Sequence, residues 1–330
     1  MRVIENIFEL EENLQDSYVA IGTFDGVHYG HQKLIKNAVE KAKKNGGKSV
    51  VFTFSSHPME LIDISRAPRV INTIEEKLYL LENMGVDCVI LQSFTKEFAN
   101  LTADEFADIL KEKVGSKEIF VGFNFSFGEG GKSKTKDLIR LGEERGILVH
   151  EIPAVYVDGD LISSTFLRNR ILHADIAEIN RYLGHRFLIM GEVVHGKKIA
   201  RELGFPTANI KISTRLYPKN GIYGARVKIE GEDFYRDGVV NIGVNPTLKP
   251  GEKSVEVNIL DFDEFIYGKI VAVELEQYLR EEKKFSSIDE LKRVIGNDVK
   301  TWTKVVKERR NGYMSEAVCA VLDYGFNKLG

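Results

Sequence analysis

Short apolar runs alternate with longer amphipathic segments through the first half of this chain. Five apolar runs have the length of buried strands, at residues 19–21, 49–54, 88–92, 119–122 and 148–152. Between them, apolar positions recur every three or four residues, as in helices that bury one face, at residues 34–45, 75–84, 103–113 and 134–145. Strands that alternate with helices form a mostly parallel sheet with helices on both faces. We therefore predict an α/β domain that binds ligands at the carboxyl ends of its strands.

The pattern changes near Gly184. Beyond it, runs of strand-forming residues follow one another, separated by Gly, Pro and Asn, at residues 188–194, 222–229, 234–242, 255–260 and 270–279. No helical pattern intervenes before residues 287–295, so we predict an antiparallel β-barrel or sandwich. The expected domains are residues 1–182 (α/β) and 183–300 (β), joined by a short helical connection. Residues 301–330 form a C-terminal extension that we expect to be helical.

Composition limits the classes of function. A chain of 330 residues has room for two domains of ordinary size. The net charge of −3 gives no reason to expect a nucleic-acid partner, and no apolar run reaches the roughly 20 residues that span a bilayer. The two cysteines lie far apart, and the acidic first twelve residues do not resemble a signal peptide. We expect a cytoplasmic protein with no membrane contact; the oligomeric state stays open.

The segment that joins the first predicted strand to the first helix carries the clearest chemical signal. It turns at Gly22, Gly26 and Gly30, and His28 and His31 flank the last glycine. Backbone N–H groups at such a turn, together with the helix dipole, favour bound phosphate. Two imidazoles at this place can donate hydrogen bonds to phosphate oxygens. The alternative is an ordinary strand–helix turn with incidental histidines; the strand–turn–helix context favours the phosphate site.

Residues 22–31, Gly-Thr-Phe-Asp-Gly-Val-His-Tyr-Gly-His, resemble the nucleotidyltransferase signature of the bacterial bifunctional riboflavin kinase/FMN adenylyltransferase (FAD synthetase) family. The resemblance extends from about residue 15 to residue 298. It implies a Rossmann-like nucleotidyltransferase domain followed by a β-barrel riboflavin kinase domain. It also implies that His28 and His31 are catalytic and that ATP phosphates contact Gly22, Phe24, Gly26 and Gly30.

A second phosphate motif lies at residues 162–168, Ile-Ser-Ser-Thr-Phe-Leu-Arg. Serine and threonine before a helical run are commonly N-caps, which is the plain structural interpretation. The same hydroxyls, with helix N–H groups and one arginine, also form a phosphate clamp. The family carries Ile-Ser-x-Thr-x-x-Arg here. The resemblance implies that Arg168 stabilises the leaving pyrophosphate and that phosphates contact Ser163, Ser164 and Thr165.

The segment 121–128, Val-Gly-Phe-Asn-Phe-Ser-Phe-Gly, resembles the Gly-x-Asp-Phe-x-Phe-Gly of the family, which implies a flavin contact from Asn124 and Phe127. The alternative is that these phenylalanines simply pack in a core. Asn124 stands where the family has Asp, and the arginine expected after Gly128 is absent. Just before His57, Ser56 stands where the family has a proline. For His57 itself, a structural loop residue and a ligand contact are equally plausible interpretations.

In the second half, residues 203–209, Leu-Gly-Phe-Pro-Thr-Ala-Asn, resemble the riboflavin kinase signature. The resemblance implies ATP contacts from Gly204 and Pro206. A hydroxyl and an amide oxygen suit Mg²⁺, so Thr207 and Asn209 are the expected metal ligands. The alternative for Pro-Thr-x-Asn is a turn with side-chain caps.

Two further segments match the kinase, residues 241–247 (Asn-Ile-Gly-Val-Asn-Pro-Thr) and 255–262 (Val-Glu-Val-Asn-Ile-Leu-Asp-Phe). Glu256 and Asn258, which replaces the usual His, share one face of a predicted strand. A carboxylate there can take the proton of a substrate hydroxyl, and because Glu256 lies within the matched segment, the resemblance implies that it is the catalytic base. The alternative is an ordinary surface glutamate. The resemblance places Arg280 and Phe285 on the flavin side.

These motifs predict a bifunctional enzyme. ATP would phosphorylate riboflavin to FMN, and a second ATP would adenylylate FMN to FAD with release of pyrophosphate, both with Mg²⁺. The expected partners are small molecules only. Two alternatives remain open. One is a monofunctional riboflavin kinase with a degenerate first domain, and the other is a flavin-sensing protein without turnover.

Overall fold

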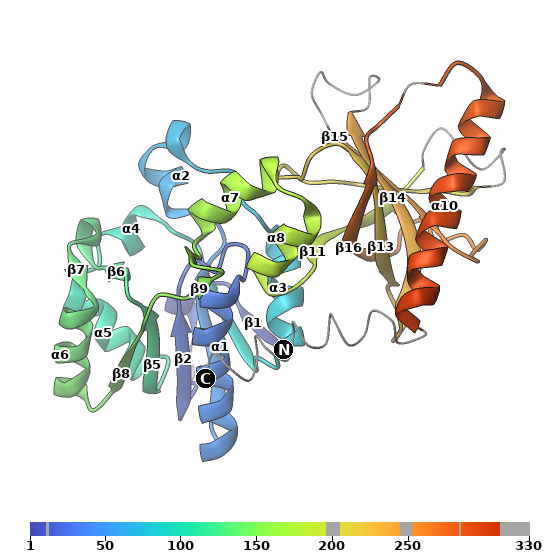
Figure 1. The fold of residues 1–330 in the computed structure, drawn as a ribbon. Helices are drawn as coiled ribbons and strands as arrows, with labels where there is room; N and C mark the ends of the chain where they lie inside the picture. Colours follow the sequence, from blue (N-terminus) through green and yellow to red (C-terminus); the bar gives the residue numbers. More distant parts are fainter. Residues whose placement is uncertain (11–12, 196–204, 245–252, 284, 311–330) are drawn as a thin grey trace. The chain divides into compact units, whose positions relative to one another are not determined.

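The computed structural model describes residues 1–10, 13–195, 205–244, 253–283 and 285–310 (Figure 1). These residues form two compact units. The first unit contains residues 1–172, together with residues 181–185 and 214–217. The remaining described residues form the second unit.

The first unit is built on a six-stranded sheet in which every neighbouring pair is parallel. Its strands, in spatial order, are β1 (Arg2–Ile4), β4 (Cys88–Gln92), β3 (Lys48–Phe54), β2 (Ser17–Ile21), β5 (Ser116–Gly122) and β8 (Leu148–Ile152). The predicted parallel sheet is confirmed, with β1 as an additional edge strand. The strand order reverses at β2, where ligands of open parallel sheets bind.

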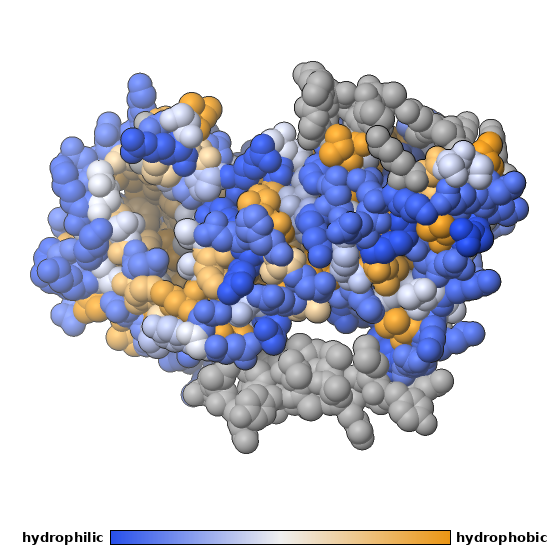
Figure 2. Space-filling view, turned by 45° about the horizontal axis from the view of Figure 1, so that its top comes forward, coloured by the Kyte–Doolittle hydropathy of each residue, from blue (hydrophilic) through white to orange (hydrophobic). Residues whose placement is uncertain are grey.

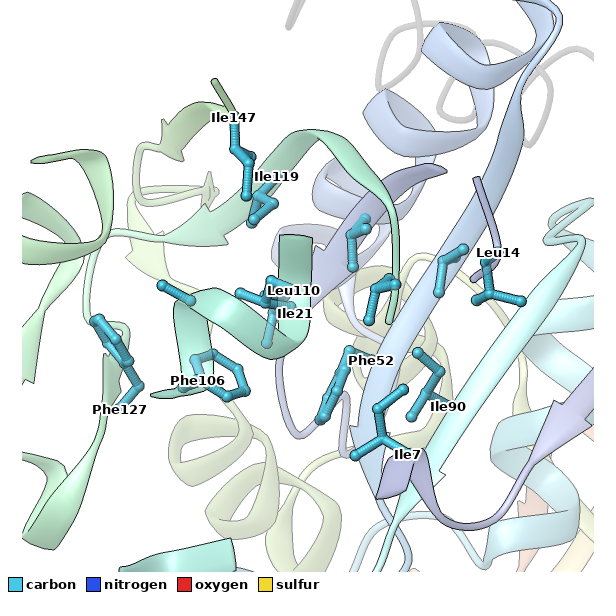
Figure 3. Close-up of a cluster of buried hydrophobic side chains, with 14 of the residues drawn as sticks. Ile7, Leu14, Ile21, Phe52, Ile90, Phe106, Leu110, Ile119, Phe127 and Ile147 are labelled. Atoms are coloured by element: carbon cyan, nitrogen blue, oxygen red, sulfur yellow. The ribbon is translucent and has the colours of Figure 1, made fainter. Parts of the chain in front are cut away.

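Both faces of this sheet are buried. Along β2, Val19 and Ile21 belong to one core cluster, whereas Tyr18 and Ala20 belong to the other. The first cluster contains Phe52, Ile90 and Leu110 (Figure 3). The helices of this part of the chain are α1 (Tyr29–Asn45), α2 (Pro58–Ile62), α3 (Ile74–Asn83), α4 (Lys96–Ala99), α5 (Ala103–Glu112), α6 (Thr135–Arg145), α7 (Ser164–His173) and α8 (Ile176–Leu183). Two short hairpins pair β6 (Ser126–Phe127) with β7 (Ser133–Lys134) and β9 (Tyr156–Val157) with β10 (Asp160–Leu161).

The second unit is a closed antiparallel barrel, which decides between the two predicted β architectures. Its strands, in spatial order, are β11 (Phe187–Val194), β12 (Ala208–Ile210), β15 (Lys253–Ile259), β14 (Arg236–Val244), β13 (Gly221–Ile229) and β16 (Ile270–Arg280). Sequence analysis does not predict β12, because its three residues follow Pro-Thr and carry no alternating pattern of their own.

Helix α10 (Ile288–Arg310) lies against β14 and β16 of the barrel. It is longer than predicted and continues through residues 301–310, the described part of the C-terminal extension. Trp302 is almost fully buried and packs over Gly224, while Arg309 pairs with Glu276 and Asp237. None of the helices in the described ranges is long and apolar enough to cross a membrane.

The close contact between Trp302 of α10 and Gly224 of the barrel predicts that a methyl group added at Gly224 lowers stability. A Cβ on Gly224 would lie 2.2 Å from Cε3 of Trp302. We expect Gly224→Ala to lower the free energy of unfolding by about 1–3 kcal/mol through overpacking. Among the described residues, a Cβ on Gly296 of α10 would meet Phe205 alone, at 3.7 Å, so Gly296→Ala should instead stabilise the helix by roughly 1 kcal/mol. Urea unfolding followed by the fluorescence of Trp302, the single tryptophan, measures both. Equal stabilities of Gly224→Ala and wild type would contradict the packing described.

Candidate functional site

The glycine turn, residues 22–28, leaves the end of β2 and enters α1, with His28 as the N-cap residue. Gly26 has φ of +85°, and Phe24 and Val27 are also in the left-handed region at +49° and +40°. Non-glycine residues rarely adopt this conformation, and such strain is concentrated at functional sites. Phe24, predicted to contact ATP, is fully buried, and its ring meets that of His31 edge-on at 5.2 Å. The observed contact of Phe24 is therefore with the histidine ring.

The two histidines of the motif stack on each other, with ring centroids 3.6 Å apart. Within the described residues, the buried Nδ1 atoms of His28 and His31 have no hydrogen-bond partner. Burial lowers the pKa of His28 to about 3, assisted by His185 and Arg168. Burial likewise lowers the pKa of His31 well below 6.5, with further lowering by the charges of His28, Lys77 and Arg168. Both imidazoles are therefore neutral at physiological pH.

Asp25 joins the two predicted phosphate motifs. Its carboxylate accepts hydrogen bonds from the backbone N–H groups of Ile71 and Asn72 at 2.8 and 3.2 Å. The same carboxylate forms an ion pair with Nη2 of Arg168 at 2.6 Å, and its backbone carbonyl accepts from the Ser164 hydroxyl at 2.9 Å. Residues about 140 positions apart in sequence therefore meet at one aspartate, Ser164 at its backbone carbonyl and Arg168 at its carboxylate.

Helix α7 presents the second motif. The Ser163 hydroxyl accepts from the N–H of Phe166 at 3.2 Å, so the N-cap interpretation holds for this residue. Ser164 instead bonds to the glycine turn, and Thr165 is exposed in the first helical turn. Nε of Arg168 donates to the carbonyl of Arg69 at 3.1 Å, which together with Asp25 fixes the guanidinium. The two motifs thus meet, with the N-terminal turn of α7 bonded to the glycine turn.

Sequence analysis did not identify Lys77, which is buried on α3. Its ammonium donates to the carbonyls of Thr23 and Phe54 at 2.9 and 3.3 Å and to the Thr53 hydroxyl at 3.4 Å. Burial lowers the pKa of Lys77 to about 8, against the opposing effect of Asp25. The available signal was periodicity, because Lys77 lies three residues after Ile74 and four before Leu81, on the apolar face of its helix.

Three other polar residues support the turn. The side chain of Gln32 donates to the carbonyls of Val27 and Leu183, both at 2.9 Å. Nε2 of His185 lies 2.9 Å from the carbonyl oxygen of Gly26. Nδ1 of His57 accepts from the N–H of Met59 at 3.2 Å and caps α2, so this atom serves the loop.

The two residues of the first unit that are predicted to contact flavin differ in exposure. Asn124 is exposed in the turn that follows β5. Phe127 is buried in the core, 5.6 Å from the ring centroids of both Phe106 and Phe125 (Figure 3). Its observed environment is that of the core-packing alternative. In the space-filling view the first unit is hollowed, and apolar residues line the hollow (Figure 2).

In the barrel, the predicted kinase residues share one face. Asn209 of β12 and Asn241 of β14 are both register partners of Glu256 in β15, so the three side chains point to the same side. Asn258, two residues from Glu256, donates to the carbonyl of Pro206 at 2.8 Å. Within the described residues, Oδ1 of Asn241 is buried without a hydrogen-bond partner.

A pocket in the barrel unit is lined by β12, by the two residues before it and by the loop that precedes β16, and its lining includes Pro206, Thr207, Asn209, Asp263 and Tyr267. No group of three His, Cys, Asp or Glu side chains in the described part of the chain could hold a metal ion. Thr207 and Asn209 do offer hard oxygen atoms, which fits Mg²⁺ bound mainly through substrate phosphates and water. Gly204 lies outside the described residues.

Arg280, predicted to face flavin, forms a two-pronged pair with Asp298 of α10 at 2.6 and 2.8 Å. Its third nitrogen donates to the carbonyl of Glu281 at 2.8 Å. Phe285 is half-buried. The observed contacts of Arg280 therefore hold α10 to the end of β16.

Comparison with known proteins gives two family matches. The sequence profile described as FAD synthetase matches residues 10–166, and the profile described as riboflavin kinase matches residues 183–306. The chain is 36% identical over 300 residues to a protein of Escherichia coli K12, covering 90% of this chain and 96% of the relative. It is 32% identical over 295 residues to a protein of Bacillus subtilis 168, covering 88% and 92%. Both relatives are named bifunctional riboflavin kinase/FMN adenylyltransferase.

A solved structure is also similar throughout its length. It is titled a macrolide-efflux protein from Streptococcus pneumoniae and superimposes with a TM-score of 0.77 at 32% sequence identity. The match covers 91% of this chain and 98% of that one, so the two proteins share both units.

The neutral state of His28 makes stability depend on pH. Between its folded pKa of about 3 and the unfolded value near 6.5, only the unfolded chain binds a proton at this residue. Stability from His28 is therefore present above pH 6.5 and falls as pH decreases, by about 2 kcal/mol at pH 5. We expect urea unfolding of His28→Gln to show a correspondingly smaller loss between pH 7 and 5 than wild type. His173→Gln, at an exposed position, is the control; equal pH dependence in all three proteins would contradict a neutral His28.

Proposed function

The chain belongs to the bifunctional riboflavin kinase/FMN adenylyltransferase family, and from this premise we propose that its two units divide two successive reactions between them. The protein converts riboflavin to FMN and FMN to FAD, with ATP as co-substrate. The FAD synthetase profile covers the parallel-sheet unit, which supports assigning adenylyl transfer to it. The riboflavin kinase profile covers the barrel and α10, which supports assigning phosphorylation to them.

In the first unit, a phosphate oxygen of FMN attacks the α-phosphorus of ATP. The bond from this phosphorus to the oxygen that bridges it to the β-phosphorus breaks, and pyrophosphate leaves. We assign the phosphates of ATP to Gly22, Gly26 and Gly30 and to the N-terminus of α1, where N–H groups and the helix dipole favour anions. Flavin is assigned to the side of Asn124.

The observation that carries this assignment is the meeting of both phosphate motifs at Asp25. With Asp25 in place, the guanidinium of Arg168 and the first turn of α7 are held against the glycine turn, where they can stabilise the pyrophosphate. His28 and His31 are neutral, so each imidazole can donate one N–H hydrogen bond, and neither has the second proton of an imidazolium to lose during the reaction. Because these donors are fixed before substrate binds, little reorganisation is needed as charge develops.

In the barrel, the 5′-hydroxyl oxygen of riboflavin attacks the γ-phosphorus of ATP. The bond from this phosphorus to the β–γ bridging oxygen breaks, ADP leaves, and the carboxylate of Glu256 takes the hydroxyl proton. Thr207 and Asn209 would hold Mg²⁺, which neutralises phosphate charge when bound. Pro206 and its pocket are assigned to ATP, and Phe285 to the flavin side, where Asp298 fixes Arg280.

The kinase assignment predicts that Glu256→Gln loses FMN formation by about 10²–10⁴-fold, because the amide cannot take the proton. Supplied FMN should still be converted to FAD at the wild-type rate, since adenylyl transfer is assigned to the other unit. Chromatographic separation of FMN and FAD after incubation with riboflavin, ATP and Mg²⁺ measures both reactions. A near-normal kinase rate for Glu256→Gln would refute its role as base.

The adenylyltransferase assignment predicts the opposite loss. His31→Ala should reduce FAD formation from FMN by about 10²-fold or more, because it removes a fixed donor to the reacting phosphates, and should leave FMN formation intact. The same product assay on wild type tests the function itself. If wild type forms FMN from riboflavin but forms no FAD from saturating FMN with ATP and Mg²⁺, the protein is a monofunctional kinase. If it forms neither FMN nor FAD, the flavin-sensor alternative is supported.

A further inference from the structure

Lys77 carries a buried charge that no carboxylate in the described part of the chain neutralises directly. The residue is 7% exposed, and the three acceptors of its ammonium are two backbone carbonyls and one hydroxyl. Buried lysines are ordinarily paired, because an ammonium removed from water loses its hydration. Here the described structure places no carboxylate oxygen within ion-pair distance of Nζ.

The neighbouring charged groups do not neutralise the ammonium of Lys77. The carboxylate of Asp25 is already paired with Arg168 and accepts two backbone hydrogen bonds. His28 and His31 are neutral because burial lowers the pKa of each. Two cations therefore stand beside one anion, and the surroundings of the glycine turn keep one positive charge in excess.

The acceptors of Lys77 connect this charge to the site. Thr23 belongs to the glycine turn that follows β2, and Thr53 and Phe54 end β3. One ammonium thus joins the carboxyl ends of two neighbouring strands at the place where the strand order reverses. The charge also acts on His31, whose pKa it helps to lower.

We propose that Lys77 is a positioning residue for adenylyl transfer, and that its excess charge is completed by the phosphates of ATP bound at the glycine turn. The inference rests on the function proposed for the first unit. All three donors of Lys77 are occupied by protein, so the residue acts through the turn it holds and through its electric field, without touching substrate. Its role explains why the fold keeps an ammonium where an apolar side chain would otherwise pack.

This role makes ATP binding depend on pH. Burial lowers the pKa of Lys77 to about 8, so the ammonium is charged at pH 7 and loses its proton above pH 8. The charged or titratable groups that act on Lys77 and on its neighbours are two carboxylates, one guanidinium and four imidazoles: Asp25, Glu60, Arg168, His28, His31, His57 and His185. Burial lowers the pKa of His28, His31 and His57, and imidazole, carboxylate and guanidinium groups ordinarily have pKa values outside the range from pH 7 to 9.5. Lys77 is therefore the group expected to titrate there.

The experiment compares four full-length proteins, wild type, Lys77→Arg, Lys77→Met and Lys113→Met, in FAD formation from saturating FMN between pH 7 and 9.5. Lys113 is the matched control, because its ammonium also donates to two backbone carbonyls, those of Phe8 and Leu10, but near the start of β2. We expect the wild-type KM for ATP to rise on the order of tenfold or more above pH 8. Lys77→Arg should remove this rise, because arginine stays charged.

At pH 7, Lys77→Met should already raise the KM for ATP by about 10- to 100-fold with a smaller change in kcat, and this KM should not vary with pH. Lys113→Met should behave as wild type. Riboflavin phosphorylation in the same samples, compared at each pH, should be equal in all four proteins. Urea unfolding of each variant shows whether it is folded at the assay temperature.

Three outcomes would overturn the proposal. These are a wild-type KM for ATP that is constant from pH 7 to 9.5, a pH-dependent rise that persists in Lys77→Arg, and a folded Lys77→Met variant with wild-type KM. A variant that loses only kcat, equally at every pH, would make Lys77 a purely structural residue. Failure of the proposed function is distinct, because wild type would then form no FAD at any pH.

Discussion

The architecture of the first site depends on one ion pair, that of Asp25 with Arg168. The carboxylate belongs to the glycine turn after β2, and the guanidinium belongs to α7, more than 140 residues later. Hydrogen bonds from Ile71, Asn72 and Ser164 converge on the same aspartate. Because Asp25 is buried and Arg168 is half-buried, breaking the pair leaves a buried carboxylate uncompensated and is destabilising. The pair therefore both stabilises the fold and fixes the position of the Arg168 guanidinium beside the glycine turn.

The electrostatics of this site follow from burial more than from the number of charges. Both histidines of the motif are neutral, because burial makes protonation unfavourable, and the positive potential comes from Arg168 and Lys77. A site of neutral donors and fixed cations suits phosphates, since neither needs to change protonation during transfer. The barrel differs, because it presents the Glu256 carboxylate and the side chains of Asn209 and Asn241 on one face of neighbouring strands.

Sequence patterns predicted the architecture well where local periodicity determines structure. The α/β and β halves and most of the predicted strands are observed. The phosphate motifs were recognisable because their residues are adjacent in sequence. Asp25 lies inside a motif, yet its partners depend on tertiary folding. The only sequence signal for Lys77 was a charged residue on the apolar face of a helix. The pairing of Arg280 with Asp298 depends on the position of α10 against the barrel, which the sequence does not give. The three-residue strand β12 had too few residues to show a period.

The most direct test of the central claim is a double-mutant cycle on kcat/KM for FAD formation from FMN, using Asp25→Asn, Arg168→Met and the double variant. If the pair acts as one unit, each single variant already loses what the pair provides, and the double variant should be no slower than the slower single variant by more than a few-fold. Losses that multiply in the double variant would show that the two residues act independently. That result would contradict a site organised by their ion pair.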